Sequence, residues 1–142
     1  MKSSKEILSS VVKTAQMGQI GIRSVRDYAY SHRLKDALNS QLKEYDMIES
    51  EAQKLAKDQN WELKELNPAL KFMSSACAKA NLTMGNVDSR IAAMMINGNT
   101  RGMIKGIKNQ HHSKCVDEQV NALASKLISY EEANIQQMQE YL

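Results

Sequence analysis

The feature that most constrains the fold of this chain is an apolar pattern of helical period that runs through long segments without proline. In residues 34–55 the pattern repeats at alternating steps of four and three, and its members are Leu34, Leu38, Gln41, Tyr45, Ile48, Ala52 and Leu55. Steps of three and four return to the same face of a helix, so this segment is an expected amphipathic helix. Pro68 is the only proline in 142 residues, and helix-favouring residues are plentiful. The sequence therefore predicts an all-α protein.

Three other segments carry the same pattern. Ser3 or Ser4 can cap a first helix that runs to about Tyr30. Its apolar stripe contains Leu8, Val11, Ala15, Ile22, Val25 and Ala29. Asn67-Pro68 is a start signal for a third helix, with a stripe of Leu70, Met73, Cys77, Ala80, Met84, Val87, Ile91 and Met94. The last helix begins between Ser113 and Asp117, and its stripe contains Val116, Val120, Leu123, Leu127 and Tyr130.

Gly98, in an Asn-Gly-Asn sequence, is expected to end the third helix, and Asn99 or Thr100 to cap a short helix through about Lys108. Four long amphipathic helices with short links predict one four-helix-bundle domain over residues 1–142, with an extra short helix between helices three and four. We expect an up-down-up-down order. The link after the second helix is long enough that a crossover stays open as an alternative.

Composition limits the classes of function. The 19 basic and 16 acidic residues are interleaved, which is typical of solvated helix faces and not of a membrane surface. No apolar run is long enough to span a bilayer, and the first residues do not resemble a signal peptide. Cys77 and Cys115 do not form a Cys-x-x-Cys pair. Reduced thiols and a cytoplasmic location are the simplest interpretation.

The second helix carries polar residues halfway along its apolar stripe. Gln41 and Tyr45 face inward there, and Gln19 occupies the matching gap in the first helix. A di-iron bundle needs carboxylates and Glu-x-x-His pairs at this level, and the candidate ligands here are Glu44, Asp88, Glu131 and Asn134. No histidine lies on these faces. We therefore expect a hydrogen-bonded layer that sets the helix register and no cofactor, with iron or manganese binding as the alternative.

The segment from Arg101 to Lys114 contains four basic residues and no acidic one. Arg101, Lys105 and Lys108 are candidate ligands for a phosphate or an acidic partner. The segment lacks interleaved aromatic residues, so nucleic acid is not the expected partner. His111-His112 is expected in a solvated loop.

Several apolar residues fall outside the inward stripes, namely Met17, Ile20, Met47 and Met95. Such a strip favours a homodimer or another protein partner. No serine or cysteine has a visible base partner, and no glycine-rich phosphate loop is present. The leading hypothesis is therefore a non-enzymatic interaction or structural module.

Four stretches also carry a resemblance to a known family: QMGQIGI, QLKEYDMIESEA, DSRIAAMMINGNTRGMI and EEANIQQMQEYL. They resemble a family of small uncharacterised bacterial proteins, similar to ferritin-like four-helix bundles of the DUF2383 type. The resemblance spans nearly the whole chain and implies the fold. The family pattern has a histidine and a glutamate where this chain has Arg90 and Ala93, a departure that removes two possible metal ligands.

Overall fold

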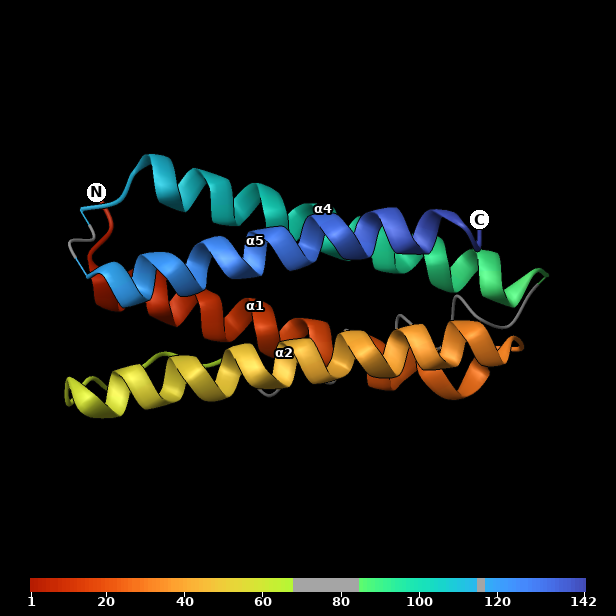
Figure 1. Ribbon diagram of the computed structural model, residues 1–142, viewed down its shortest axis with the longest axis horizontal. Helices are drawn as coiled ribbons and strands as arrows, with labels where there is room; N and C mark the ends of the chain where they lie inside the picture. The colour runs from red at the N-terminus through yellow and green to blue at the C-terminus, as the bar shows by residue number, and fades with distance from the viewer. Residues whose placement is uncertain (68–84, 115–116) are drawn as a thin grey trace.

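Four long helices lie side by side in the part of the chain that the structure describes (Figure 1). The structure is a computed structural model, and it describes residues 1–67, 85–114 and 117–142. The helices are α1 (Ser4–Val25), α2 (His32–Asp58), α4 (Val87–His111) and α5 (Glu118–Gln139), and the 3-10 turn η1 (Arg26–Tyr28) follows α1. The predicted all-α helical bundle is confirmed for these residues.

Each helix begins at a residue whose side chain accepts a hydrogen bond from the first turn. Ser3 forms a capping box with Glu6 at the start of α1, and Ser31 accepts from the Leu34 N–H at the start of α2. Asn86 and Asp117 cap α4 and α5 in the same way. These contacts satisfy backbone donors that have no partner within the helix. The predicted start of the last helix is confirmed, whereas α1 ends at Val25, before the predicted Tyr30.

The expected end of the third helix at Gly98 is wrong. α4 starts at Val87 and continues without a break to His111, so no separate short helix follows Gly98. The start predicted at Pro68 and the stripe from Leu70 to Met84 lie outside the described residues. One glycine costs a helix only ~1 kcal/mol. That cost is small beside the burial of Met95 and Asn99, which lie on either side of Gly98.

The order of helix directions also differs from the prediction. The Asp88 carboxylate accepts hydrogen bonds from the Tyr30 and Ser31 N–H groups at 2.7 and 3.1 Å, so α4 begins at the end of the bundle where α2 begins. The other end of α4 lies beside the start of α1, where Lys2 pairs with the backbone of His112 and Lys114. Thus α2 and α4 run parallel, opposite to α1 and α5 (Figure 1). The up-down-up-down order is wrong.

The crossover that the sequence left open accounts for this arrangement, because the chain between Asp58 and Val87 joins opposite ends of the bundle. Its described first part lies along α1, where the Lys64 N–H donates to Ser9 Oγ and the Leu66 N–H to Gln16 Oε1. Trp61 and Leu63 pack against the core there. A link with packed side chains can therefore return the chain without disturbing the four helices.

The core confirms most of the predicted faces. On α2, the stripe from Leu34 to Ala52 is buried, and Leu8, Ile22 and Ile91 are fully buried on the neighbouring helices. No helix in the described ranges is long and apolar enough to cross a membrane.

The apolar strip expected outside the bundle is largely absent. Met95 is only 6% exposed and belongs to the core, while Met17 and Ile20 are half-buried. Of these four side chains, only that of Met47 is exposed to solvent, as the predicted strip requires. The homodimer stays a prediction, without the surface on which it was based.

Candidate functional site

Polar side chains from three helices meet inside the bundle. We call Gln41, Tyr45, Asn99, Glu131 and Asn134 the polar layer; none of these side chains is more than 3% exposed. Gln41 and Tyr45 come from α2, Asn99 from α4, and the other two from α5. The helical spacing of three or four residues places the members of each helix on one face. The expected polar level is therefore present, with Asn99 as an additional member.

Tyr45 is the centre of this layer. Its hydroxyl lies 2.6 Å from Asn99 Oδ1 and 3.0 Å from Glu131 Oε1. A tyrosine hydroxyl has one proton to donate, and both neighbours are acceptors when Glu131 is ionised. In both contacts the Tyr45 hydroxyl is the donor, and its one proton can satisfy only one of the two oxygens at a time. A negative charge on Glu131 is therefore only partly stabilised by this hydrogen bond.

The electrostatics of the layer favour a neutral Glu131, because burial outweighs the hydrogen bond from Tyr45. Burial raises the pKa of Glu131 to about 8, with a smaller contribution from the charge of Glu44, while the hydrogen bond to Tyr45 acts in the opposite direction. Burial also raises the pKa of Tyr45 well above its ordinary value. A charged group is costly to bury without a partner of opposite charge. At neutral pH the polar layer therefore carries little charge.

Two glycines make room for these side chains. A Cβ atom on Gly18 of α1 would lie 2.6 Å from the Tyr45 ring, and one on Gly102 of α4 would lie 3.0 Å from Glu131 Oε1. The close neighbour of Gly18 is thus an aromatic side chain. Absence of a side chain at these two positions lets the ring and the carboxyl reach each other.

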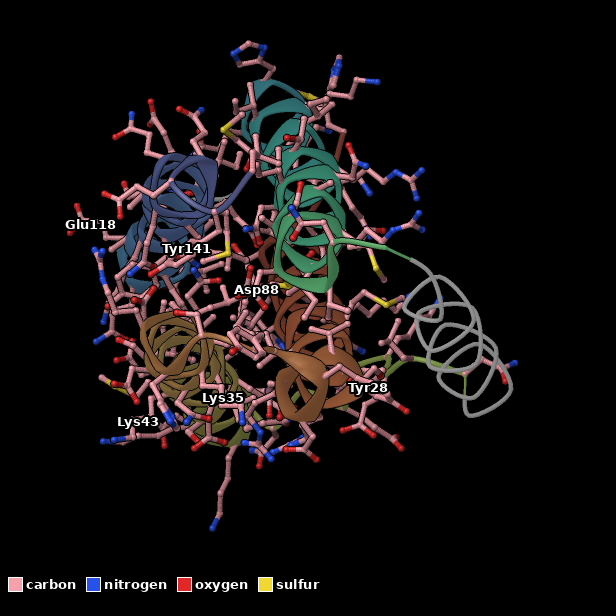
Figure 2. All side chains as sticks on the ribbon, turned by 90° about the vertical axis from the view of Figure 1, so that its right-hand side faces the viewer. Tyr28, Lys35, Lys43, Asp88, Glu118 and Tyr141 are labelled. Carbon is pink, nitrogen blue, oxygen red and sulfur yellow. The ribbon has the colours of Figure 1, made fainter. Side chains whose placement is uncertain are left out.

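The predicted metal ligands do not come together as one set. Glu44, Glu131 and Asn134 lie at the same level, since Asn134 lowers the pKa of Glu44 while burial raises it. Asp88 lies at the end of the bundle, where its carboxylate is occupied by two backbone N–H groups (Figure 2). Among the described residues, no group of three His, Cys, Asp or Glu side chains could hold a metal ion.

Buried polar atoms without a hydrogen-bond partner test the fit of a metal more directly. In the described residues they are Gln41 Oε1, Glu44 Oε2, Asn99 Nδ2, Glu131 Oε2 and Asn134 Nδ2. Two of these five atoms are amide nitrogens that present hydrogens to the layer, and a cation is repelled by such donors. A mixed set of donors and acceptors matches hydrogen-bonding molecules such as water better than iron or manganese. The donor set does not fit a di-metal centre.

Gln19 is buried on α1 but does not join Tyr45. Its Nε2 donates to Glu49 Oε1 at 3.2 Å, and Gln41 Nε2 donates to Gln137 Oε1 at 2.9 Å. The sequence interpretation missed Asn99, which it assigned to a helix cap. The signal was present: Asn99 follows Ile91 and Met95 at steps of four, the spacing of one helix face.

A second candidate site lies on the surface, at the end of the bundle where the chain starts. Lys2, Arg101, Lys105, Lys108 and His112 line a groove of about 450 Å³, together with Ile104 and Asn109. We call it the basic groove. The three predicted anion ligands all lie in it, along one face of α4. Lys2 is added by its backbone pairing with residues 112–114, a contact between distant parts of the chain that no local pattern predicts.

Among the described residues, no acidic side chain forms an ion pair with the cations of the basic groove. The ion pairs in the described part of the chain are Arg26–Asp27, Arg33–Glu140 and Lys126–Glu51, and none involves the groove. Burial lowers the pKa of Lys105, and the positive charges of Lys13 and Lys2 lower it further. A group of like charges without counter-charges attracts anions.

Comparison of the chain with models of known protein families, with curated proteins and with solved structures found no match. The class that the coordinates define is thus an all-α helical bundle with one long crossover connection, a neutral polar layer and a basic groove.

Proposed function

We propose that this protein is a non-enzymatic, ferritin-like helical bundle that acts by binding an anionic partner in the basic groove. The ferritin-like assignment is supported by the connection between α2 and α4, because ferritin-like bundles have one long crossover. The family resemblance of the sequence points in the same direction. The helix order does not indicate whether the protein binds a metal. The hydrogen-bond donors and acceptors of the polar layer do not fit a metal ion.

The polar layer is better suited to a structural role than to a catalytic one. Its side chains are buried, and Tyr45 of α2 is hydrogen-bonded to Asn99 of α4 and to Glu131 of α5. Gln41 of α2 donates to Gln137 of α5, outside the layer. A catalytic group must reach its substrate within hydrogen-bond distance or through one water molecule, and the groove residues do not include any member of the layer. Buried polar side chains that bond across helices set register and orientation.

The single observation that carries the proposal is the set of cations around the basic groove, which form no ion pair with an acidic side chain of the described residues. Arg101, Lys105 and Lys108 follow one another at steps of four and three on α4, so they project from one face. The groove volume of about 450 Å³ lies in the range of small-molecule sites, ~300–1,000 Å³. Repulsion among the cations is relieved when an anion binds.

The test is an NMR titration with sulfate, citrate and inorganic phosphate. We expect amide shifts for Lys2 and residues 101–112, with apparent affinity that falls steeply as the salt concentration rises. A variant with Arg101→Gln, Lys105→Gln and Lys108→Gln should lose these shifts. The matched control is Lys43→Gln, Lys54→Gln and Lys57→Gln, which removes the same charge from exposed positions of α2, including Lys43 on its outer side (Figure 2). Binding that the control abolishes, or no shift in the groove, would contradict the proposal.

A further inference from the structure

The basic groove also indicates which kind of anion it binds. Building on the proposed function, we infer that its ligand is an oligophosphate, a chain of two or more linked phosphate groups that is recognised through the phosphates alone. Such a chain occurs as inorganic polyphosphate or as the phosphate part of a nucleotide. The chemistry shared by the two sources is a compact row of negative charges.

The first argument is the shape of the charge distribution. Arg101 and Lys108, with Lys105 between them, are seven residue steps apart on α4, roughly 10 Å along the helix axis. Lys2 extends the row at one end, since its backbone is bonded to His112 and Lys114. Lys13 of α1 lies close enough to lower the pKa of Lys105. The cations thus form an elongated cluster to which the N-terminal segment, α1 and α4 all contribute. A small anion would contact only part of this cluster.

The second argument is the amount of charge. No acidic side chain of the described residues forms an ion pair with the groove, so a bound anion would be the nearest negative charge to Lys2, Lys105 and Lys108. Each linked phosphate adds negative charge and strong acceptor oxygens within a small volume. A single phosphate or a monocarboxylate leaves most of the repulsion in place.

The third argument is the lining. Among the described residues, the groove has the apolar side chain of Ile104, which is 46% exposed, but no Phe, Tyr or Trp on which a base could stack. Its flat side chains are the smaller ones of Arg101 and His112. Sites that bind nucleic-acid bases in single strands use aromatic stacking as their main contact, so a nucleotide gains less here from its base than from its phosphates. The phosphate chain is therefore the part of the ligand that determines affinity.

The experiment is isothermal titration of the whole chain with orthophosphate, pyrophosphate, tripolyphosphate and ATP at one fixed salt concentration. We expect affinity to rise with each phosphate, with tripolyphosphate binding about tenfold or more tightly than orthophosphate, a difference of ~1.4 kcal/mol. ATP should bind within about threefold of tripolyphosphate, since among the described residues the groove offers its base no Phe, Tyr or Trp and only the smaller flat side chains of Arg101 and His112. The double variant Lys105→Gln, Lys108→Gln should lose most of this gain, while Lys43→Gln, Lys54→Gln should not. Circular dichroism checks that both variants are folded.

Four outcomes would overturn the inference, and they separate it from the proposed function. Equal affinities for orthophosphate and tripolyphosphate, with shifts in the groove, would refute the oligophosphate and leave anion binding intact. Much tighter binding of ATP than of tripolyphosphate would mean that the base is recognised. Equal losses in the Lys43 and Lys105 variants would indicate diffuse attraction to the whole surface. Absence of binding by every anion would refute the inference and the proposed function together.

Discussion

Glu131 is the residue whose chemistry depends most on the fold. Its side chain is 2% exposed, it contacts Tyr45, and its second oxygen has no partner among the described residues. The charged groups that face it are Glu44 and, after ionisation, Tyr45, both of which oppose a negative charge on it. A carboxylic acid that holds its proton in such a position is stable, whereas a carboxylate is not.

The pH dependence of stability tests this protonation. The ordinary pKa of 4.5 rises to about 8 on folding, so the folded state retains a proton that the unfolded chain releases. The contribution of the Glu131 proton to the free energy of unfolding is therefore full below about pH 4.5. It is lost as the pH rises through about 8, a change on the order of several kcal/mol. Glu131→Gln should make the free energy of unfolding depend less on pH and should raise the melting temperature at pH 8. The exposed neighbour is the control, since Glu132→Gln should leave the pH profile unchanged. A profile of Glu131→Gln that equals that of the unmodified chain would show that Glu131 is ionised.

Gly18 is the second position where one residue decides the packing. Gly18→Ala would place a methyl group against the ring of Tyr45, which is buried and held by hydrogen bonds at its hydroxyl. We expect a loss of about 1–3 kcal/mol from overpacking. Gly21→Ala, in the same helix with no atom nearby, should instead stabilise the protein by up to ~1 kcal/mol. Urea unfolding of both variants provides the measurement, and equal effects of the two would contradict the close approach of Tyr45.

At the scale of elements, α4 shows that tertiary contacts can outweigh a local sequence preference for ending a helix. Asn-Gly-Asn is typical of a helix end, yet the helix continues through it because Asn99 bonds to Tyr45 and Met95 is buried. Such tertiary contacts outweigh an intrinsic preference of ~1 kcal/mol. A positive φ, which favours glycine, occurs instead at Gly85, just before the cap of α4, where φ is 73°.

Two alanine substitutions distinguish these glycines. Gly98→Ala should stabilise the protein by up to ~1 kcal/mol, because Gly98 lies inside a helix and a Cβ would meet nothing within 4 Å. Gly85→Ala should destabilise it by about 1 kcal/mol, since a side chain disfavours positive φ. Thermal unfolding compares the two. A destabilising Gly98→Ala would mean that the helix is interrupted at that position.

At the scale of the whole molecule, the four helices close around one core. Ile91 of α4 is fully buried among residues of the core cluster, whereas Ile107 of the same helix is 37% exposed. Ile91→Asp should unfold the domain at a cost of several kcal/mol, because it buries a charge without a partner. Ile107→Asp should change the melting temperature little. Circular dichroism melts decide between them, and a near-native melt of Ile91→Asp would place that residue outside the core.

Local sequence determined the helices and most of their inward faces. Steps of three and four, capping side chains such as Ser3 and Asp117, and the scarcity of proline act within one or two helical turns, so they can be read along the chain. The polar level at Gln41, Tyr45 and Glu131 was predictable for the same reason. So was the cluster of Arg101, Lys105 and Lys108, which belongs to one face of one helix.

Only the tertiary structure decided how these faces meet. The parallel direction of α2 and α4 follows from contacts such as Tyr30 with Asp88, which lie 58 positions apart in the chain. Side chains from distant segments also decide the continuity of α4 and the role of Asn99. They likewise decide the proton on Glu131 and the position of Lys2 beside Lys108. The free energies of burial and of charge interaction depend on which side chains are neighbours in the folded protein. A local sequence pattern does not specify those neighbours.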